Sequence, residues 1–165
     1  MLLGGAPRLG LTGAPGAGKS PLLDALVRAH RARGESVGIV AVDPSSRAIG
    51  GALLGDRVRV RSAASDPGVF FRSLAARESL GGLSDAARAA ATIMAAVFDV
   101  VIVETVGVGQ SEADVADLVD TLVFVAQPAA GDTVQFLKAG VLELPDVIAV
   151  NKADLGALAE RTARE

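Results

Sequence analysis

Residues 13–20, Gly-Ala-Pro-Gly-Ala-Gly-Lys-Ser, have the composition and spacing of a loop that binds phosphate groups. Its glycines allow the backbone to turn tightly and to aim successive N–H groups at anionic oxygens. The Lys19 ammonium would reach the β- and γ-phosphates of a nucleotide, and the Ser20 hydroxyl would bind Mg²⁺. A glycine-rich turn with a chance Lys-Ser pair is the alternative, but the loop stands between an expected strand and an expected helix. The pattern therefore predicts a nucleotide site with contacts from Gly13, Ala14, Gly16, Ala17, Gly18, Lys19, Ser20 and Pro21.

Pro21 directly follows this loop and carries no backbone N–H. In the first turn of a helix an N–H has no intrahelical partner, so proline is tolerated there. It removes one donor that could meet the α-phosphate, and we expect it to push Ser20 away from helical geometry. A lost hydrogen bond to a charged group costs about 1.5–3 kcal/mol. Nucleotide binding is therefore expected to be weaker by about tenfold or more.

Residues 151–154, Asn-Lys-Ala-Asp, close an expected strand at the sheet edge where ligands of open α/β sheets gather. The Asp154 carboxylate would accept hydrogen bonds from N1–H and the 2-amine of guanine, donors that adenine lacks. Asn151 would make a polar contact and orient neighbouring loops, and the Lys152 stem could lie along the base. Together with the phosphate loop, this motif predicts GTP and GDP as ligands.

Glu104 lies at the end of an expected strand, within the run Val-Ile-Val-Glu-Thr-Val-Gly of residues 101–107, and Gly107 follows three positions later. In this pattern the acid approaches magnesium, commonly through a water, and the glycine N–H senses the γ-phosphate. A strand-end glutamate that caps a helix is the alternative interpretation. Gln110 lies three positions beyond the glycine and receives no catalytic role.

Two aspartates in and before a long polar segment are further candidates for the magnesium shell or for holding the attacking water: Asp43 and Asp56. Aspartate in a loop is more often a turn former, which remains the alternative. The single histidine, His30, is interpreted as solvated surface.

Apolar, β-branched runs alternate with helix-like segments along the chain. This alternation predicts repeated β-α-β units and an α/β fold with a mostly parallel sheet flanked by helices. The expected strands are 8–12, 36–43, 99–104, 120–127 and 146–154. The expected helices are 21–34, 84–98 with a cap at Ser84 or Asp85, 111–119, 131–144 and a short one within 69–80, and a further helix begins in 155–165.

The chain of 165 residues has a net charge of −3 and no cysteine. It is long enough for about one domain with a real core. The charge gives no reason to expect nucleic-acid binding, and no apolar run has the length of a membrane span. A disulfide framework and a thiolate metal site are excluded. We expect one domain over 1–165, with cytoplasmic localisation as the default.

Taken together, several segments resemble the MeaB/ArgK group of P-loop GTPases. The most specific are 104–112, Glu-Thr-Val-Gly-Val-Gly-Gln-Ser-Glu, and 51–57, Gly-Ala-Leu-Leu-Gly-Asp-Arg, with the glycine before it. The resemblance covers about residues 8–155 and implies a P-loop NTPase fold. It also implies magnesium-dependent GTP hydrolysis, coupled to loading or protecting the cofactor of an adenosylcobalamin-dependent methylmalonyl-CoA mutase.

On matching positions, the resemblance implies that Lys19 and Ser20 act at the phosphates and magnesium, and Asn151 and Asp154 at the guanine. The implied metal or catalytic carboxylates are Asp43, Asp56 and Glu104.

The chain departs from the family pattern in three ways. Pro21 replaces the usual threonine, and Glu78 stands where glycine is usual. Family members are also about twice as long, with helices before the phosphate loop and a C-terminal dimerisation arm. The resemblance thus implies a GTPase core whose sheet is incomplete at its C-terminal side, whereas the family forms homodimers.

The sequence therefore predicts a magnesium-dependent GTPase domain that serves an adenosylcobalamin-dependent mutase and turns over slowly without a partner. Two alternatives stay open: an ATP-using transport-system kinase or ATPase, as an older family label suggests, and a nucleotide-binding module without efficient hydrolysis.

Overall fold

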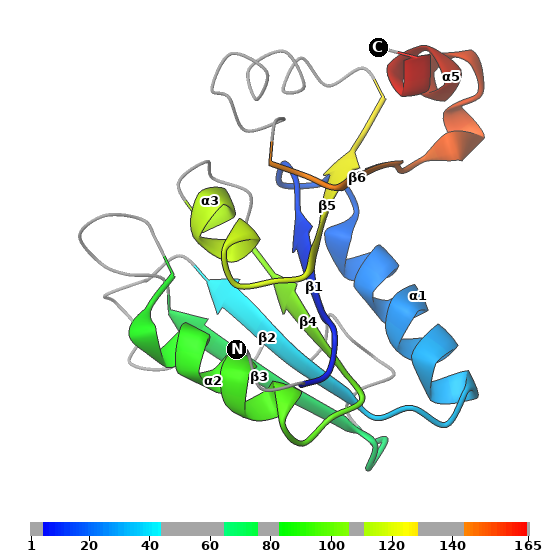
Figure 1. The fold of residues 1–165 in the computed structure, drawn as a ribbon. Helices are drawn as coiled ribbons and strands as arrows, with labels where there is room; N and C mark the ends of the chain where they lie inside the picture. Colours follow the sequence, from blue (N-terminus) through cyan, green and yellow to red (C-terminus); the bar gives the residue numbers. More distant parts are fainter. Residues whose placement is uncertain (1–4, 44–64, 76–82, 106–110, 129–143, 165) are drawn as a thin grey trace.

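A parallel sheet forms the centre of the computed structural model, which describes residues 5–43, 65–75, 83–105, 111–128 and 144–164 (Figure 1). Within these residues the sheet has six strands in the order β3-β2-β4-β1-β5-β6, and all neighbouring pairs are parallel. The strands are β1 Arg8–Thr12, β2 Val37–Asp43, β3 Val69–Ala75, β4 Val100–Glu104, β5 Thr121–Ala126 and β6 Val147–Val150.

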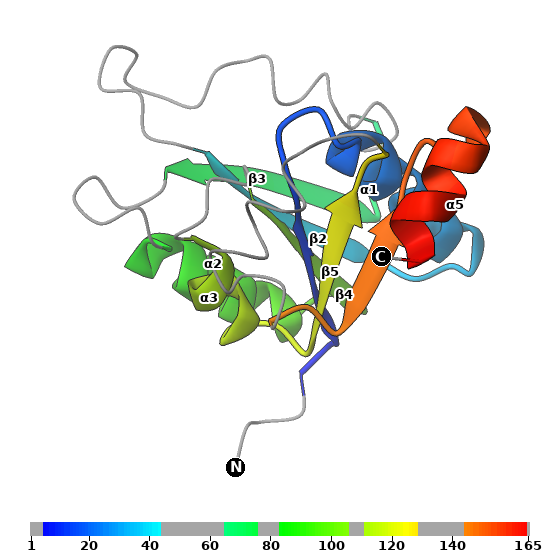
Figure 2. The same ribbon diagram turned by 90° about the horizontal axis from the view of Figure 1, so that it is seen from above.

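Helices cover both faces of this sheet (Figure 2). Helix α1, Lys19–Ala32, packs on one face, while α2, Asp85–Ala95, and α3, Ser111–Ala116, pack on the other. A 3-10 turn, η3 Ala153–Leu155, and helix α5, Ala157–Arg164, follow β6 at the edge of the sheet. Because every strand is parallel, the carboxyl ends of the strands all lie at the same end of the sheet, and the segments that follow the strands meet there.

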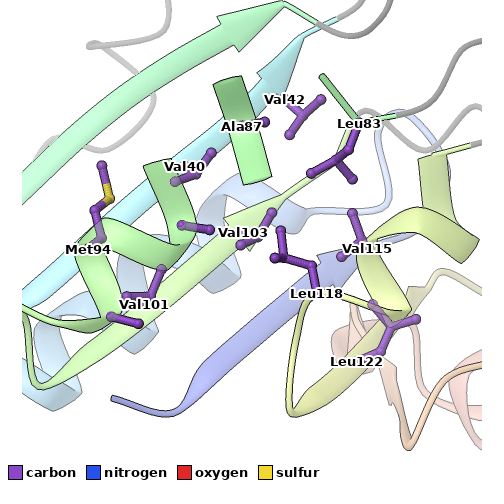
Figure 3. Packing of buried hydrophobic residues seen from close by; sticks show 12 residues of the cluster. Val40, Val42, Leu83, Ala87, Met94, Val101, Val103, Val115, Leu118 and Leu122 are labelled. Atoms are coloured by element: carbon purple, nitrogen blue, oxygen red, sulfur yellow. The ribbon is translucent and has the colours of Figure 1, made fainter. Parts of the chain in front are cut away.

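The core divides into two layers because successive residues of a strand point to opposite faces. In β4, Val101 and Val103 face α2 and α3, and Val100 and Ile102 face α1. Figure 3 shows the first layer, where Leu83 lies between the two helices and the sheet. Strand β4, at the centre of the sheet, is therefore apolar on both sides, as its continuous β-branched run predicts.

Most expected elements are confirmed. The five expected strands correspond to β1, β2, β4, β5 and β6, and helices occupy the expected segments 21–34, 84–98 and 111–119. Ser84 caps α2, since its Oγ accepts a hydrogen bond of 3.3 Å from Ala87 N–H. The expected helix 131–144 lies almost wholly outside the described residues.

The short helix expected within 69–80 is wrong for residues 69–75, which form strand β3, and residues 76–80 lie outside the described residues. They pair in parallel with β2 along its whole length, from Val37↔Val69 to Asp43↔Ala75. Val69, Phe70 and Phe71 are residue types that favour strands. The sheet edge offered by β2 satisfies their backbone hydrogen bonds, which a short isolated helix would leave to water.

At the opposite end of the sheet, aspartates precede strands and accept hydrogen bonds from the backbone of a neighbouring segment. Asp99, before β4, accepts from Ser36 N–H at 2.7 Å, and Asp120, before β5, accepts from Arg8 N–H at 2.7 Å. Asp146, before β6, accepts from Leu122 N–H at 2.7 Å. These contacts tie each strand to its neighbour where the strands begin.

The end of α1 joins the same region. His30 Nδ1 lies 2.6 Å from Glu35 Oε2, and the His30 side chain is only 19% exposed, so the interpretation of this residue as solvated surface is wrong. Arg31 Nε donates to Asp66 Oδ2 at 2.9 Å. These bonds hold the end of the helix against the strand beginnings.

None of the described helices has both the length and the apolar character that crossing a membrane requires.

Candidate nucleotide-binding site

The phosphate loop connects β1 to α1 with three glycines in left-handed or related backbone conformations, with φ of 139° at Gly13, 79° at Gly16 and 98° at Gly18. Such positive φ values are strained for other residues. Gly13 also packs directly on the Val125 carbonyl of β5, which leaves no room for a side chain. The glycine pattern therefore reflects both backbone conformation and close packing.

Helix α1 begins at Lys19, directly after this loop. Its first intrahelical bond runs from Leu22 N–H to the Gly18 carbonyl at 3.2 Å. Pro21 is the third helical residue, the last position at which a missing N–H disturbs no helical bond. Ser20 lies within the helix, so the expectation that Pro21 moves it out of helical geometry is wrong.

The Lys19 side chain is 8% exposed and lies over the loop. Its Nζ donates to the carbonyl oxygens of Gly13 at 2.6 Å and Ala14 at 3.0 Å. These two carbonyl oxygens orient the ammonium over the loop. A buried cation at the N-terminus of a helix, where the helix dipole is positive, favours an anionic ligand.

Glu104 ends β4 beside β1 and reaches the start of α1. Ser20 Oγ donates to Glu104 Oε1 at 3.1 Å. A hydroxyl and a carboxylate in contact are hard oxygen donors of the kind that Mg²⁺ prefers, completed by waters and phosphate oxygens. The pair fits a magnesium ion at the phosphate end of the site.

The other two proposed carboxylates are Asp43 and Asp56. The backbone of Asp43 ends β2, two residues beyond Ala41, which pairs with Glu104. Asp56 and Gly107 lie outside the described residues. Within the described ranges, no three His, Cys, Asp or Glu side chains gather as a metal site.

Asn151 brings the base-reading motif to the phosphate loop. Its Nδ2 donates to the Ala17 carbonyl at 2.9 Å, and its side chain packs against the α-carbon of Gly18. Its own backbone N–H donates to the Ala126 carbonyl at the end of β5, at 2.9 Å. Two segments 134 residues apart in the sequence thus form one structure, as expected for a single nucleotide site.

Lys152 and Asp154 follow. The Lys152 backbone is left-handed, with φ of 55° and ψ of 44°, and caps η3. Asp154 lies in η3 and is exposed, so its carboxylate is accessible to a ligand. The structure gives no direct contact between Asp154 and the phosphate loop.

Sequence reasoning missed two features here. Thr12 and Thr105, at the ends of β1 and β4, are almost fully buried, and Thr105 Oγ1 donates to Thr12 Oγ1 at 3.1 Å. Gln127, after β5, accepts a hydrogen bond of 2.6 Å from Lys152 Nζ. A polar residue at a strand end is the only signal in the sequence for either.

Comparison with known proteins identifies relatives of this chain. The family model of the methylmalonyl Co-A mutase-associated GTPase MeaB matches residues 2–165. A relative from Pyrococcus horikoshii is 54% identical over 154 residues, 93% of this chain and 49% of the relative. GTPase ArgK of Escherichia coli is 45% identical over 152 residues, 92% of this chain and 46% of that protein.

A solved structure, that of the LAO/AO transport system kinase, has the same fold, with a TM-score of 0.67 and 34% identity over 99% of this chain and 45% of the other. The chain spans about half the length of the curated relatives it matches.

Proposed function

The chain belongs to the family of methylmalonyl Co-A mutase-associated GTPases, MeaB, and from this premise we propose that it binds GTP and GDP and hydrolyses GTP with Mg²⁺. The phosphates would lie on residues 13–20 and the guanine against 151–154.

One observation carries this proposal: the 2.9 Å hydrogen bond from Asn151 Nδ2 to the Ala17 carbonyl. A phosphate loop alone serves many nucleotides, and Asn-Lys-Ala-Asp alone could occur by chance. The bond makes the two motifs neighbours, so that one nucleotide can use both. Asp154 then supplies the preference for guanine, because adenine would leave its carboxylate unpaired.

The chain's own groups have distinct roles in the proposed hydrolysis. The loop N–H groups and the Lys19 ammonium bind the β- and γ-phosphates and offset charge that develops as the terminal phosphate leaves. Ser20 and Glu104 would hold the metal, and Asp43 or Asp56 would join the metal shell or hold the attacking water. Mg²⁺, when bound, supplies further charge neutralisation at the phosphate oxygens.

Turnover is expected to be slow in the isolated chain. An arginine placed at the phosphates accelerates such reactions strongly in other GTPases. The described residues that form this site include no arginine. We therefore propose that a partner completes the active arrangement, and that this partner is an adenosylcobalamin-dependent mutase of the methylmalonyl-CoA type, in keeping with the family description.

Calorimetric titration of the 165-residue chain with GDP and with ADP, both with Mg²⁺, tests the nucleotide assignment. We expect GDP to bind at least about a hundredfold more tightly, since a site that hydrogen-bonds the base rejects a base without the matching donors. Asp154→Ala should remove most of this preference while leaving ADP binding unchanged.

A preference for ADP would instead favour an ATP-using kinase, and the LAO/AO transport system kinase, whose fold this chain shares, is named for such an activity. Single-turnover hydrolysis of GTP, with Glu104→Ala as the control, then separates an enzyme from a binding module. Equal hydrolysis by both proteins would remove Glu104 from the mechanism.

A further inference from the structure

The turn that carries the base-reading residues has an unfavourable backbone conformation. Among the described residues, Lys152 is the one non-glycine with positive φ, at 55°. A residue with a β-carbon loses about 1–2 kcal/mol in this conformation. Neighbouring contacts must therefore hold the turn that leads from Asn151 to Asp154.

Backbone contacts hold both sides of this turn. Before it, Asn151 N–H donates to the Ala126 carbonyl at 2.9 Å. After it, Leu155 N–H donates to the Lys152 carbonyl at 3.0 Å. The Lys152 side chain is a third part of the turn that needs a contact. It is long and exposed, so holding it in one conformation costs side-chain entropy.

Gln127 meets that side chain. Its Oε1 accepts a hydrogen bond of 2.6 Å from Lys152 Nζ. This bond joins the residue after β5 to the second residue after the neighbouring strand β6. An ammonium bound to a fixed acceptor forms a stronger bond than a neutral donor would. Gln127 is one residue beyond Ala126, which already holds Asn151, so two adjacent residues of one strand end support two adjacent residues of the motif.

The phosphate loop rests on the same strand end, because Gly13 packs on the Val125 carbonyl. Residues 125–127 therefore contact the phosphate loop, Asn151 and Lys152 in succession. This short segment sets the distance between the phosphate end and the base end of the site.

We infer that Gln127 is a positioning residue for guanine recognition: its Oε1 holds the Lys152 ammonium and thereby fixes the turn that presents Asp154. This inference rests on the proposed binding of guanine nucleotides. The neutral amide acts only through Lys152 and has no contact of its own with the base.

The test compares two substitutions in the 165-residue chain, Gln127→Leu, which removes the acceptor, and Gln127→Glu, which keeps an oxygen at that position. GDP and inosine diphosphate are titrated with Mg²⁺, because inosine lacks the 2-amine that Asp154 would bind. We expect Gln127→Leu to weaken GDP binding about fivefold, equivalent to about 1 kcal/mol, and to lower the GDP-to-IDP affinity ratio. Gln127→Glu should stay within about twofold of the wild type.

A purely structural loss would weaken both nucleotides equally and leave the ratio unchanged, which would overturn the inference. Equal GDP affinities of wild type and Gln127→Leu, or an equal loss in Gln127→Glu, would overturn it too. In a Lys152→Met background, Gln127→Leu should have no further effect, and an undiminished effect there would contradict a role through Lys152. A wild-type chain that binds no GDP would instead refute the proposed function itself, and the inference with it.

Discussion

Side chains bind the backbone in different ways at the two ends of the sheet. Where the strands begin, aspartate carboxylates accept hydrogen bonds from backbone N–H groups of the neighbouring segment, as Asp99 does from Ser36 and Asp120 from Arg8. Where the strands end, cationic and amide side chains donate instead, Lys19 to Gly13 and Asn151 to Ala17.

This difference indicates that the end of the sheet where the strands begin stabilises the fold, and that the end where they finish binds the ligand. At the beginning of the strands the chain supplies its own anions, and its backbone donors are bound by them. At the end of the strands Lys19 and Asn151 bind backbone carbonyl oxygens. The Lys19 ammonium and the N-terminus of α1 suit an anionic ligand. Substitutions where the strands begin should therefore change stability, and substitutions where the strands end should change nucleotide affinity.

The largest effect is expected for Lys19→Met. It removes the cation beneath the phosphates, so GDP and GTP affinity should fall by at least about a hundredfold, since charged hydrogen bonds to several phosphate oxygens are lost together. Titration calorimetry measures this loss. Arg31→Met, near the beginnings of the strands, is the matched control, which should lower the melting temperature and leave GDP affinity unchanged. A loss of GDP affinity in Arg31→Met without one in Lys19→Met would contradict the division between the two ends of the sheet.

Gly18→Ala should have the next largest effect. A β-carbon here meets Asn151 Nδ2, and the residue has φ of 98°. Strain costs about 1–2 kcal/mol and displacement of Asn151 adds to it, so we expect GDP binding to weaken by about tenfold or more.

Gly34→Ala is its control at the end of α1, with φ of 80° and open space around the β-carbon. It should lower stability through the same strain without a change in affinity. If both variants bind GDP like the wild type, the contact between Asn151 and the phosphate loop is irrelevant to binding.

Pro21→Thr should strengthen binding. Threonine restores a backbone N–H at the third position of α1, where no intrahelical carbonyl competes for it. One additional bond to a phosphate oxygen corresponds to about tenfold tighter GDP binding. Competition between the two proteins for a fluorescent GDP analogue measures the ratio, and equal affinities would mean that this N–H does not face the phosphates.

Asp99→Asn should have the smallest effect, on stability alone. Hydrogen bonds from the Ser36 N–H and hydroxyl lower the pKa of Asp99 below its ordinary 3.8. A lowered pKa stabilises the fold above the unfolded-state pKa, and this contribution disappears as the pH falls through the folded pKa. The melting temperature of the variant should therefore be a few degrees lower than that of the wild type at pH 7. The difference between the two melting temperatures should close below pH 3.8. A gap that persists in acid would contradict the charge-based account.

How much could be predicted depended on whether a feature is local in sequence. The phosphate loop, the position of Asn151 after a strand and the strands around Glu104 follow from short patterns of glycine, apolar and charged residues. The pairing of β3 with β2 could not be predicted from such patterns, because residues 69–75 adopt a strand only where an edge strand is available to pair with them. The bonds from Thr105 to Thr12 and from Lys152 to Gln127 depend equally on which strand ends become neighbours.

A crystal structure of the chain with GDP and Mg²⁺ tests the central claim most directly. We predict the diphosphate on the backbone of residues 13–20, the metal at Ser20 and Glu104, and the guanine N1–H and 2-amine at the Asp154 carboxylate. A guanine bound away from 151–154, with Asn151 no longer bonded to Ala17, would contradict it.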